Sequence, residues 1–90
     1  MQNLQNMLQG TRLIIIDTEN DNENLFNRQT RIGDIVILLK DELNTEDFVF
    51  VTSEENYKKH GGSDLILEEL DMFEADCICD FLKQSNLELA

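Results

Sequence analysis

The sequence predicts a single small domain that is mainly β. Three short runs rich in β-branched and aromatic residues indicate strands, and polar segments separate them. The chain length supports the same interpretation, because 90 residues, 41% of them hydrophobic, provide apolar surface for one core and not for two. We therefore expect residues 1–90 to form one domain.

The first third of the chain predicts a short helix, a strand and a loop. Over residues 1–9 apolar side chains recur at helical spacing, and Gly10 follows where a C-cap glycine would stand. Residues 12–17 read Arg-Leu-Ile-Ile-Ile-Asp, a β-branched run that favours a buried strand. The stretch 18–29 is rich in Asn, Asp and Glu, which predicts a long polar loop.

The middle of the chain predicts a hairpin. Residues 34–40 form a second apolar run, entered through a glycine turn, and residues 48–52 form a third. Polar turn residues lie between them, so residues 34–52 are expected to pair as a hairpin with a longer loop. We expect a polar connection over 53–63, and the alternating Leu-Glu-Leu of residues 87–89 predicts a closing edge strand.

The segment from 65 to 82 fits two structures. A C-terminal helix over residues 65–82 would stack apolar side chains at spacings of three and four and would make the domain α+β. As a strand, the same segment alternates apolar residues with Glu74, Asp76 and Asp80. Periodicity alone leaves both alternatives open. In either case the predicted core includes Ile15, Ile35, Val49, Phe50, Phe73 and Phe81.

The charge is strongly negative and unevenly distributed. The net charge is −12, and residues 41–90 hold fourteen acids and three bases, whereas residues 1–40 hold five acids and four bases. A surface of this kind repels nucleic acid and anionic lipid and attracts basic protein surfaces. The predicted partner is therefore a protein with a basic surface. Direct binding to nucleic acid or to a membrane is not expected.

The compartment indicated by the sequence is the cytoplasm. Residues 1–7 lack the basic and apolar regions of a signal peptide, and no apolar run approaches the length of a membrane span. The two cysteines, Cys77 and Cys79, stand one residue apart, too close to staple a fold. Reduced thiols agree with a cytoplasmic location.

Three short motifs resemble the small SH3-like barrels of the KOW type found in bacterial and phage proteins. They are residues 31–36 (Arg-Ile-Gly-Asp-Ile-Val), residues 77–81 (Cys-Ile-Cys-Asp-Phe) and residues 86–89 (Asn-Leu-Glu-Leu). The resemblance implies an SH3-like barrel with short helical additions and a long polar loop after the first strand. Members that bind nucleic acid carry basic loops, whereas the loop of this chain is acidic.

A second resemblance is to PIN-like nucleases, through residues 14–20 (Ile-Ile-Ile-Asp-Thr-Glu-Asn) and residues 74–76 (Glu-Ala-Asp). It implies a divalent metal site formed by Asp17, Glu19, Asp76 and Asp80. The simpler interpretation is a set of solvated acids, because no helix for a parallel crossover fits between residues 18 and 32. We therefore expect neither enzyme activity nor a cofactor or metal, and keep a metal-dependent nuclease as the alternative.

The acidic segment provides the sharpest functional hypothesis. Residues 64–80 contain seven acids and no base. On a strand or a helix, such acids would form rows of carboxylates spaced by roughly 6–7 Å or more, similar to backbone phosphates. The row would occupy a basic groove on a nucleic-acid-binding protein and so act as an inhibitor, whereas the plain alternative is a face kept negative for solubility. The predicted partner-binding residues are Glu68, Glu69, Asp71, Glu74, Asp76 and Asp80.

Overall fold

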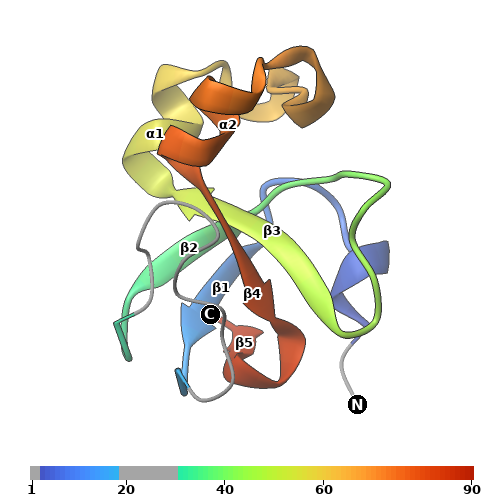
Figure 1. The fold of residues 1–90 in the computed structure, drawn as a ribbon. Helices are drawn as coiled ribbons and strands as arrows, with labels where there is room; N and C mark the ends of the chain where they lie inside the picture. Colours follow the sequence, from blue (N-terminus) through green and yellow to red (C-terminus); the bar gives the residue numbers. More distant parts are fainter. Residues whose placement is uncertain (1–2, 19–30) are drawn as a thin grey trace.

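The computed structural model describes residues 3–18 and 31–90, and shows a curved sheet capped at one end by short helices (Figure 1). The predicted polar loop over residues 18–29 lies outside the described residues except for Thr18. The elements in chain order are η1 (Leu4–Asn6), β1 (Arg12–Ile15), β2 (Ile35–Leu38), β3 (Phe48–Ser53), α1 (Glu54–Lys59), η2 (Gly62–Asp64), η3 (Leu67–Glu69), α2 (Met72–Ile78), β4 (Cys79–Lys83), η4 (Gln84–Asn86) and β5 (Leu87–Leu89), where η marks a 3₁₀ turn.

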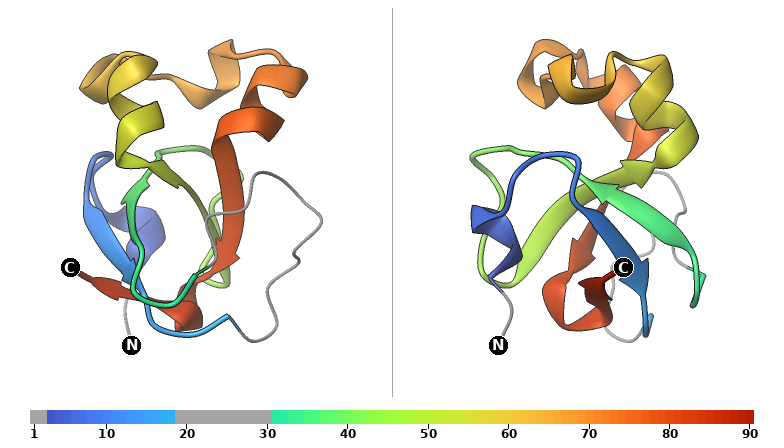
Figure 2. Two further views of the ribbon diagram at one scale, coloured as in Figure 1. Left: turned by 90° about the vertical axis from the view of Figure 1, so that its left-hand side faces the viewer. Right: turned by 180° about the vertical axis from the view of Figure 1, so that it is seen from behind.

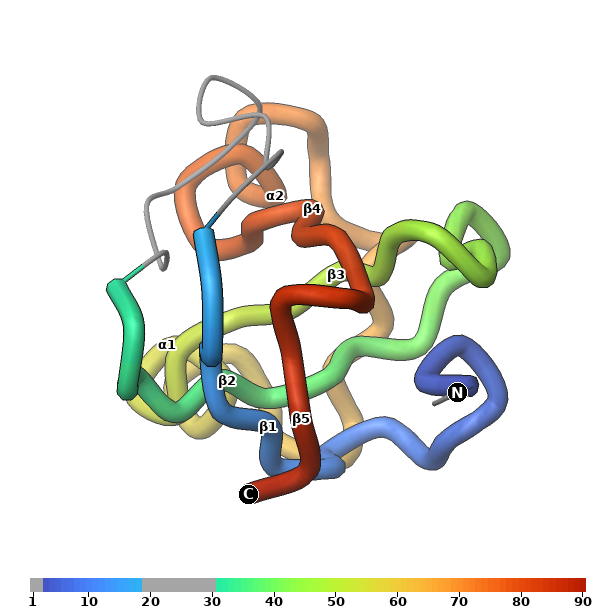
Figure 3. The backbone as a smooth tube through the Cα atoms, turned by 90° about the horizontal axis from the view of Figure 1, so that it is seen from below, coloured from blue at the N-terminus to red at the C-terminus, as the bar shows by residue number. Residues whose placement is uncertain are grey.

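The five strands form one antiparallel sheet in the order β4-β3-β2-β1-β5. The strands predicted over 12–17, 34–40 and 48–52 are neighbours in this sheet, and residues 87–89 form its edge strand, so these predictions are confirmed. Strands β4 and β5 are consecutive in sequence but lie at opposite edges, joined through η4 (Figure 3).

The predicted closed barrel is not formed by the described residues. No ladder of hydrogen bonds joins the edges β4 and β5 in residues 3–18 and 31–90, so the sheet stays open. Strands account for 29% and helical turns for 33% of this part of the chain. The secondary-structure content is therefore mixed, and the prediction of a mainly β domain is not confirmed.

One face of the sheet carries the larger hydrophobic core. Side chains alternate between the two faces of a strand, so every second residue points to the same side. The sheet core, as we call this cluster, takes residues from all five strands and from η1. Its members are Leu4, Leu13, Ile15, Val36, Leu38, Val49, Val51, Leu82 and Leu87.

A second cluster joins the sheet to the helices. We call residues 54–78, which lie between β3 and β4, the helical cap, because they stand over one end of the strands (Figure 2). The second cluster is formed by Leu39, Phe50, Leu65, Leu67, Ile78 and Cys79. Thr52 reinforces this junction, because its buried hydroxyl donates a hydrogen bond of 2.6 Å to the carbonyl oxygen of Ile78 at the end of α2.

The predictions for the cap residues were partly wrong. The polar connection predicted over residues 53–63 contains a helix, α1. Ser53 caps it by accepting a hydrogen bond from Asn56 N, with acids in the first turn and lysines in the last. Residues 65–82 adopt neither predicted structure throughout, because α2 ends at Ile78 and β4 begins at Cys79.

Phe73 is the main error in the predicted core. Its side chain is 77% exposed, because α2 turns Ala75 and Ile78 toward the second cluster and Phe73 outward. Ile15, Val49 and Phe50 are buried as predicted, while Ile35 and Phe81 are half-buried. Phe81 packs on Phe50 with ring centroids 4.4 Å apart.

The N-terminal segment forms less helix than predicted but is firmly attached. Only η1 is helical, and the Gly10 amide donates to the Leu38 carbonyl at 2.9 Å. Gly10 has φ +94°, and a Cβ atom there would lie 2.9 Å from the hydroxyl of Tyr57. The positive φ favours glycine at this position, whereas a Cβ atom would only displace the end of the tyrosine side chain. Among residues 3–18 and 31–90 we find no helix with the length and hydrophobicity needed to cross a bilayer.

Candidate functional site

The structure places five of the six predicted partner-binding residues on the surface of the cap. Glu68 and Glu69 are exposed on η3, and Glu74 and Asp76 are exposed on α2. Asp71 is exposed as well, but its carboxylate accepts a 2.8 Å hydrogen bond from Glu74 N as the N-cap of α2. It therefore has a structural role in starting the helix.

Asp80 does not belong to this surface. It is only 1% exposed, because the chain has already left α2 and entered β4 at that point. Its Cα pairs with that of Val51, so its side chain shares the sheet face on which Val51 and Leu82 pack. The prediction that Asp80 contacts a partner was wrong.

The remaining acids do not form a single row. Glu74 and Asp76 are two positions apart on a helix and so project in nearly opposite directions. Asp76 lines a hollow on the side of Leu43, and Glu74 lines a hollow on the side of His60. The phosphate-like row predicted from the sequence is thus broken by the short helix.

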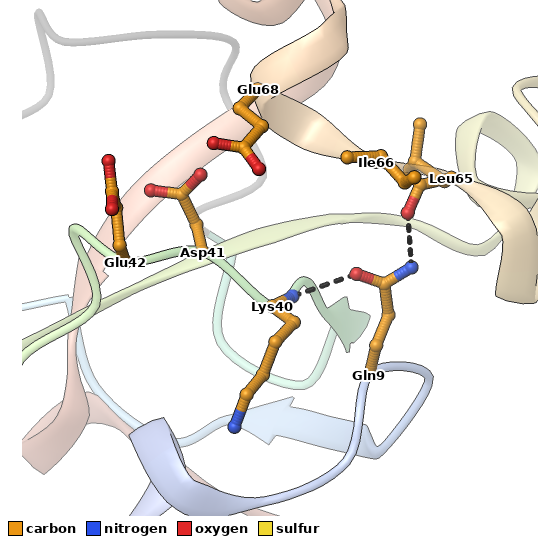
Figure 4. Close-up of a pocket in the computed structure, with 7 residues that line it drawn as sticks. All are labelled: Gln9, Lys40, Asp41, Glu42, Leu65, Ile66 and Glu68. Atoms are coloured by element: carbon orange, nitrogen blue, oxygen red, sulfur yellow. Dashed lines mark hydrogen bonds between the residues drawn. The ribbon is translucent and has the colours of Figure 1, made fainter.

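Two adjoining hollows form a distinctive surface feature in the described part of the chain. They lie between the connection after β2 and the segment containing η3 and α2, and they share Asp41, Glu42 and Glu68. We call them together the acid-rimmed groove. The first, of about 370 Å³, is lined by Gln9, Lys40, Asp41, Glu42, Leu65, Ile66 and Glu68 (Figure 4). The second, of about 380 Å³, adds the apolar side chains of Leu43, Phe50, Leu67, Leu70, Met72 and Ala75, together with Asp76.

Local hydrogen bonds hold one wall of this groove. The Asp41 carboxylate accepts a 2.8 Å bond from Leu43 N, which closes a tight turn of the Asx type. The Asn44 side chain then ties the turn to the sheet, donating to Leu39 O at 2.8 Å and accepting from Phe50 N at 2.9 Å. The turn that carries Asp41 and Glu42 is therefore fixed relative to β3.

Gln9 links the two walls. Its side-chain oxygen accepts a bond from Lys40 N at 2.8 Å, and its nitrogen donates to Leu65 O at 2.6 Å (Figure 4). One side chain thus joins the connection after β2 to the cap segment. The carboxylates of Asp41 and Glu68, from segments far apart in sequence, point toward one another (Figure 4).

The groove is strongly negative. Four carboxylates line it, from Asp41, Glu42, Glu68 and Asp76, and Lys40 is the one base among the described lining residues. The Lys40 ammonium is directed away from them and donates to Gln5 O at 3.2 Å. Among residues 3–18 and 31–90, no base lining the groove is directed at these acids, and such a cluster of carboxylates favours cationic side chains.

The two cysteines occupy different environments, Cys77 on α2 and Cys79 at the start of β4. Cys77 is exposed in a hollow of about 250 Å³ that also contains His60, Phe73 and Glu74. Cys79 is buried, and this burial raises its pKa to about 12, with the nearby carboxylates of Asp80, Asp41 and Asp76 adding to the effect. Its thiol is therefore protonated at neutral pH and does not act as a nucleophile.

The nuclease resemblance implies a metal site formed by four acids, and the three of them that lie in the described part of the chain are not brought together. Asp76 is exposed on α2 and Asp80 is buried in β4, while Asp17 is half-buried just after β1 and Glu19 lies outside the described residues. Within residues 3–18 and 31–90, no three His, Cys, Asp or Glu residues are arranged to hold a metal ion.

Sequence reasoning missed Asp41, Glu42 and Leu43. The signal was weak, an acid pair beside a leucine in a predicted turn. Their importance depends on the contact between this turn and the cap, which local patterns do not reveal. No family model, curated protein or solved structure matches the chain. Its function is therefore inferred from geometry and charge.

Proposed function

We propose that this chain is a non-catalytic, acidic protein-binding module that occupies a basic surface of a nucleic-acid-binding protein and so competes with the nucleic acid. The observation that carries the proposal is the acid-rimmed groove, in which carboxylates come from two segments and no described lining base is directed at them. Opposed carboxylates of this kind are most favourably paired with Lys or Arg side chains of another molecule.

We further propose that the fold is an open variant of the SH3-like architecture. Three features support it: the strand order β4-β3-β2-β1-β5, the single 3₁₀ turn between β4 and β5, and the long connection between β1 and β2. In this interpretation the helical cap is an insertion between β3 and β4 that provides the binding surface.

The mechanism is electrostatic. The cap residues 54–78 include eight acids and two lysines, and the whole chain carries −12. Such a field accelerates encounter with a basic surface and repels free nucleic acid. Mimicry in this form depends on carboxylates distributed around the groove and α2, and not on a regular row.

The experiment uses a short Lys/Arg peptide and a labelled DNA duplex. The peptide binds the labelled duplex, and the protein should remove the peptide from it. The fluorescence anisotropy of the duplex measures this release directly. The protein alone should leave the duplex unbound. Release should weaken steeply above about 0.1 M salt, where charges are screened within roughly 10 Å.

Two matched triple variants locate the surface. One is Glu42→Lys/Glu68→Lys/Asp76→Lys, at the groove, and the other is Glu46→Lys/Asp47→Lys/Glu88→Lys, at exposed positions that do not line it. Both change the net charge equally. The groove variant should lose most of the releasing activity and the control should keep most of it. Equal losses, or no release by the unaltered protein, would overturn the proposal.

A further inference from the structure

The second hollow of the acid-rimmed groove has an apolar lining that charge attraction does not explain. Phe50 and Leu67 are buried at its base, and Leu70 and Ala75 are half-buried beside them. Leu43 is 63% exposed and Met72 is 81% exposed where they line the same hollow. Single exposed apolar residues are ordinary, but two large ones beside one hollow with an apolar base indicate a contact surface.

The size of the hollow limits what can enter it. At about 380 Å³ it lies near the lower end of the range for ligand pockets. It is open to solvent between the turn at Leu43 and helix α2, so an occupant can enter from a neighbouring surface. A bulky apolar side chain presented by another molecule matches these dimensions.

The charge of the rim identifies the kind of partner. Asp41, Glu42, Glu68 and Asp76 surround the apolar lining. A second copy of this chain carries the same net charge of −12, so self-association would bring two negative rims together. A segment with Lys or Arg on both sides of an apolar residue can do both things that the hollow requires. Its cations pair with the rim carboxylates, and its apolar side chain packs on the apolar lining.

We propose that the groove binds an amphipathic basic segment of the partner protein, with one bulky apolar side chain inserted between Leu43 and Met72. This deepens the proposed function and rests on it. Flanking cationic residues pair with Asp41 and Glu68 on one side and with Asp76 on the other. The apolar anchor provides specificity, because a purely basic surface satisfies the rim but leaves the apolar lining exposed.

The test compares two synthetic peptides of Lys and Arg that differ only in the central residue, Leu in one and Ser in the other. The Leu peptide should bind the unaltered protein about tenfold more tightly, as expected for burial of most of one leucine side chain. In the double variant Leu43→Gln/Met72→Gln this advantage should disappear, while the affinity for the Ser peptide stays unchanged. Both substituted residues are exposed, so the fold should be retained.

Phe73→Gln is the matched control, because Phe73 is exposed on α2 to a similar degree but lines the hollow on the opposite side. It should preserve the advantage of the Leu peptide. Equal binding of both peptides by the unaltered protein would overturn this inference and leave the electrostatic function intact. Failure of both peptides to bind would overturn the proposed function as well. Self-association abolished by Leu43→Gln/Met72→Gln would show that a second copy covers the groove, and would also overturn the inference.

Discussion

The sheet and the helical cap differ in how completely they bury their large apolar residues. In the sheet core, Leu13, Val36 and Leu87 are fully buried. In the cap, Met72 and Phe73 lie on the outside of α2. The cap also carries eight acids and two lysines over residues 54–78, which opposes compaction in that region. The difference indicates that the sheet provides most of the domain's stability, and it agrees with our proposal that the cap contacts another molecule.

The largest expected effect is on stability, and it separates the two regions directly. Leu13→Ala removes a fully buried side chain from the sheet core and should lower the free energy of unfolding by about 2–5 kcal/mol. Phe73→Ala removes a larger side chain from the cap but should change the free energy of unfolding by no more than about 0.5 kcal/mol, because the ring is exposed. Urea denaturation measures both. A large loss for Phe73→Ala would mean that the cap has its own core around that ring.

The junction between the regions should give an intermediate effect. Thr52→Val removes the hydrogen bond from the Thr52 hydroxyl to the buried end of α2 at Ile78 while keeping a similar shape. We expect a loss of about 1–3 kcal/mol, because the carbonyl oxygen then lacks this donor. Thr52→Ser retains the hydroxyl and is the matched control. Equal losses in both variants would mean that packing of the methyl group, and not the hydrogen bond, holds the junction.

A smaller effect distinguishes the structural role of Asp71 from a role in binding. Asp71→Ala removes the N-cap of α2 and should cost about 1 kcal/mol, whereas Asp71→Asn keeps a capping oxygen and should cost little. Thermal denaturation provides the comparison. If Asp71→Asn instead reduced binding to basic peptides as strongly as the groove triple, Asp71 would belong to the contact surface.

The smallest expected effect on stability concerns the two cysteines, whose thiols should differ in reactivity. A thiol reagent at pH 8 should modify Cys77 rapidly and reach Cys79 only after unfolding, since Cys79 is buried with its pKa raised to about 12. The raised pKa also has a thermodynamic consequence. Above the ordinary value of 9.0 the unfolded chain loses this proton first, so stability should fall as the pH rises from about 9 to 12. Cys79→Ala should remove that part of the pH dependence. Rapid modification of both thiols in the folded protein would contradict the described burial.

The sheet could be predicted from sequence because its signals are local. Runs of β-branched residues marked β1, β2 and β3, and Leu-Glu-Leu marked β5. Helix α1 was missed although its signals were present, with Ser53 at the cap, acids in the first turn and lysines in the last. The same polar residues are also typical of a loop, so composition alone does not separate the two structures.

The candidate site was less predictable, for physical reasons. The periodicity that placed Phe73 in the core does not show which side of a seven-residue helix faces inward, and here Ala75 and Ile78 do. Asp80 looked like part of an acidic helix face until the change from helix to strand buried it. The acid-rimmed groove depends on residues 41–43 and residues 65–76 lining the same hollow, which no local pattern encodes.

The most direct measurement is an NMR titration of the isotope-labelled protein with the Leu-centred basic peptide. If the cap binds and the sheet supports it, the backbone shifts should change mainly within residues 41–43 and 65–76, the two segments that supply most of the groove lining. The amides of β1 and β5 should stay nearly unchanged. Shifts centred on β1 and β5, or spread evenly over the exposed acids of the whole chain, would contradict this division between the two regions.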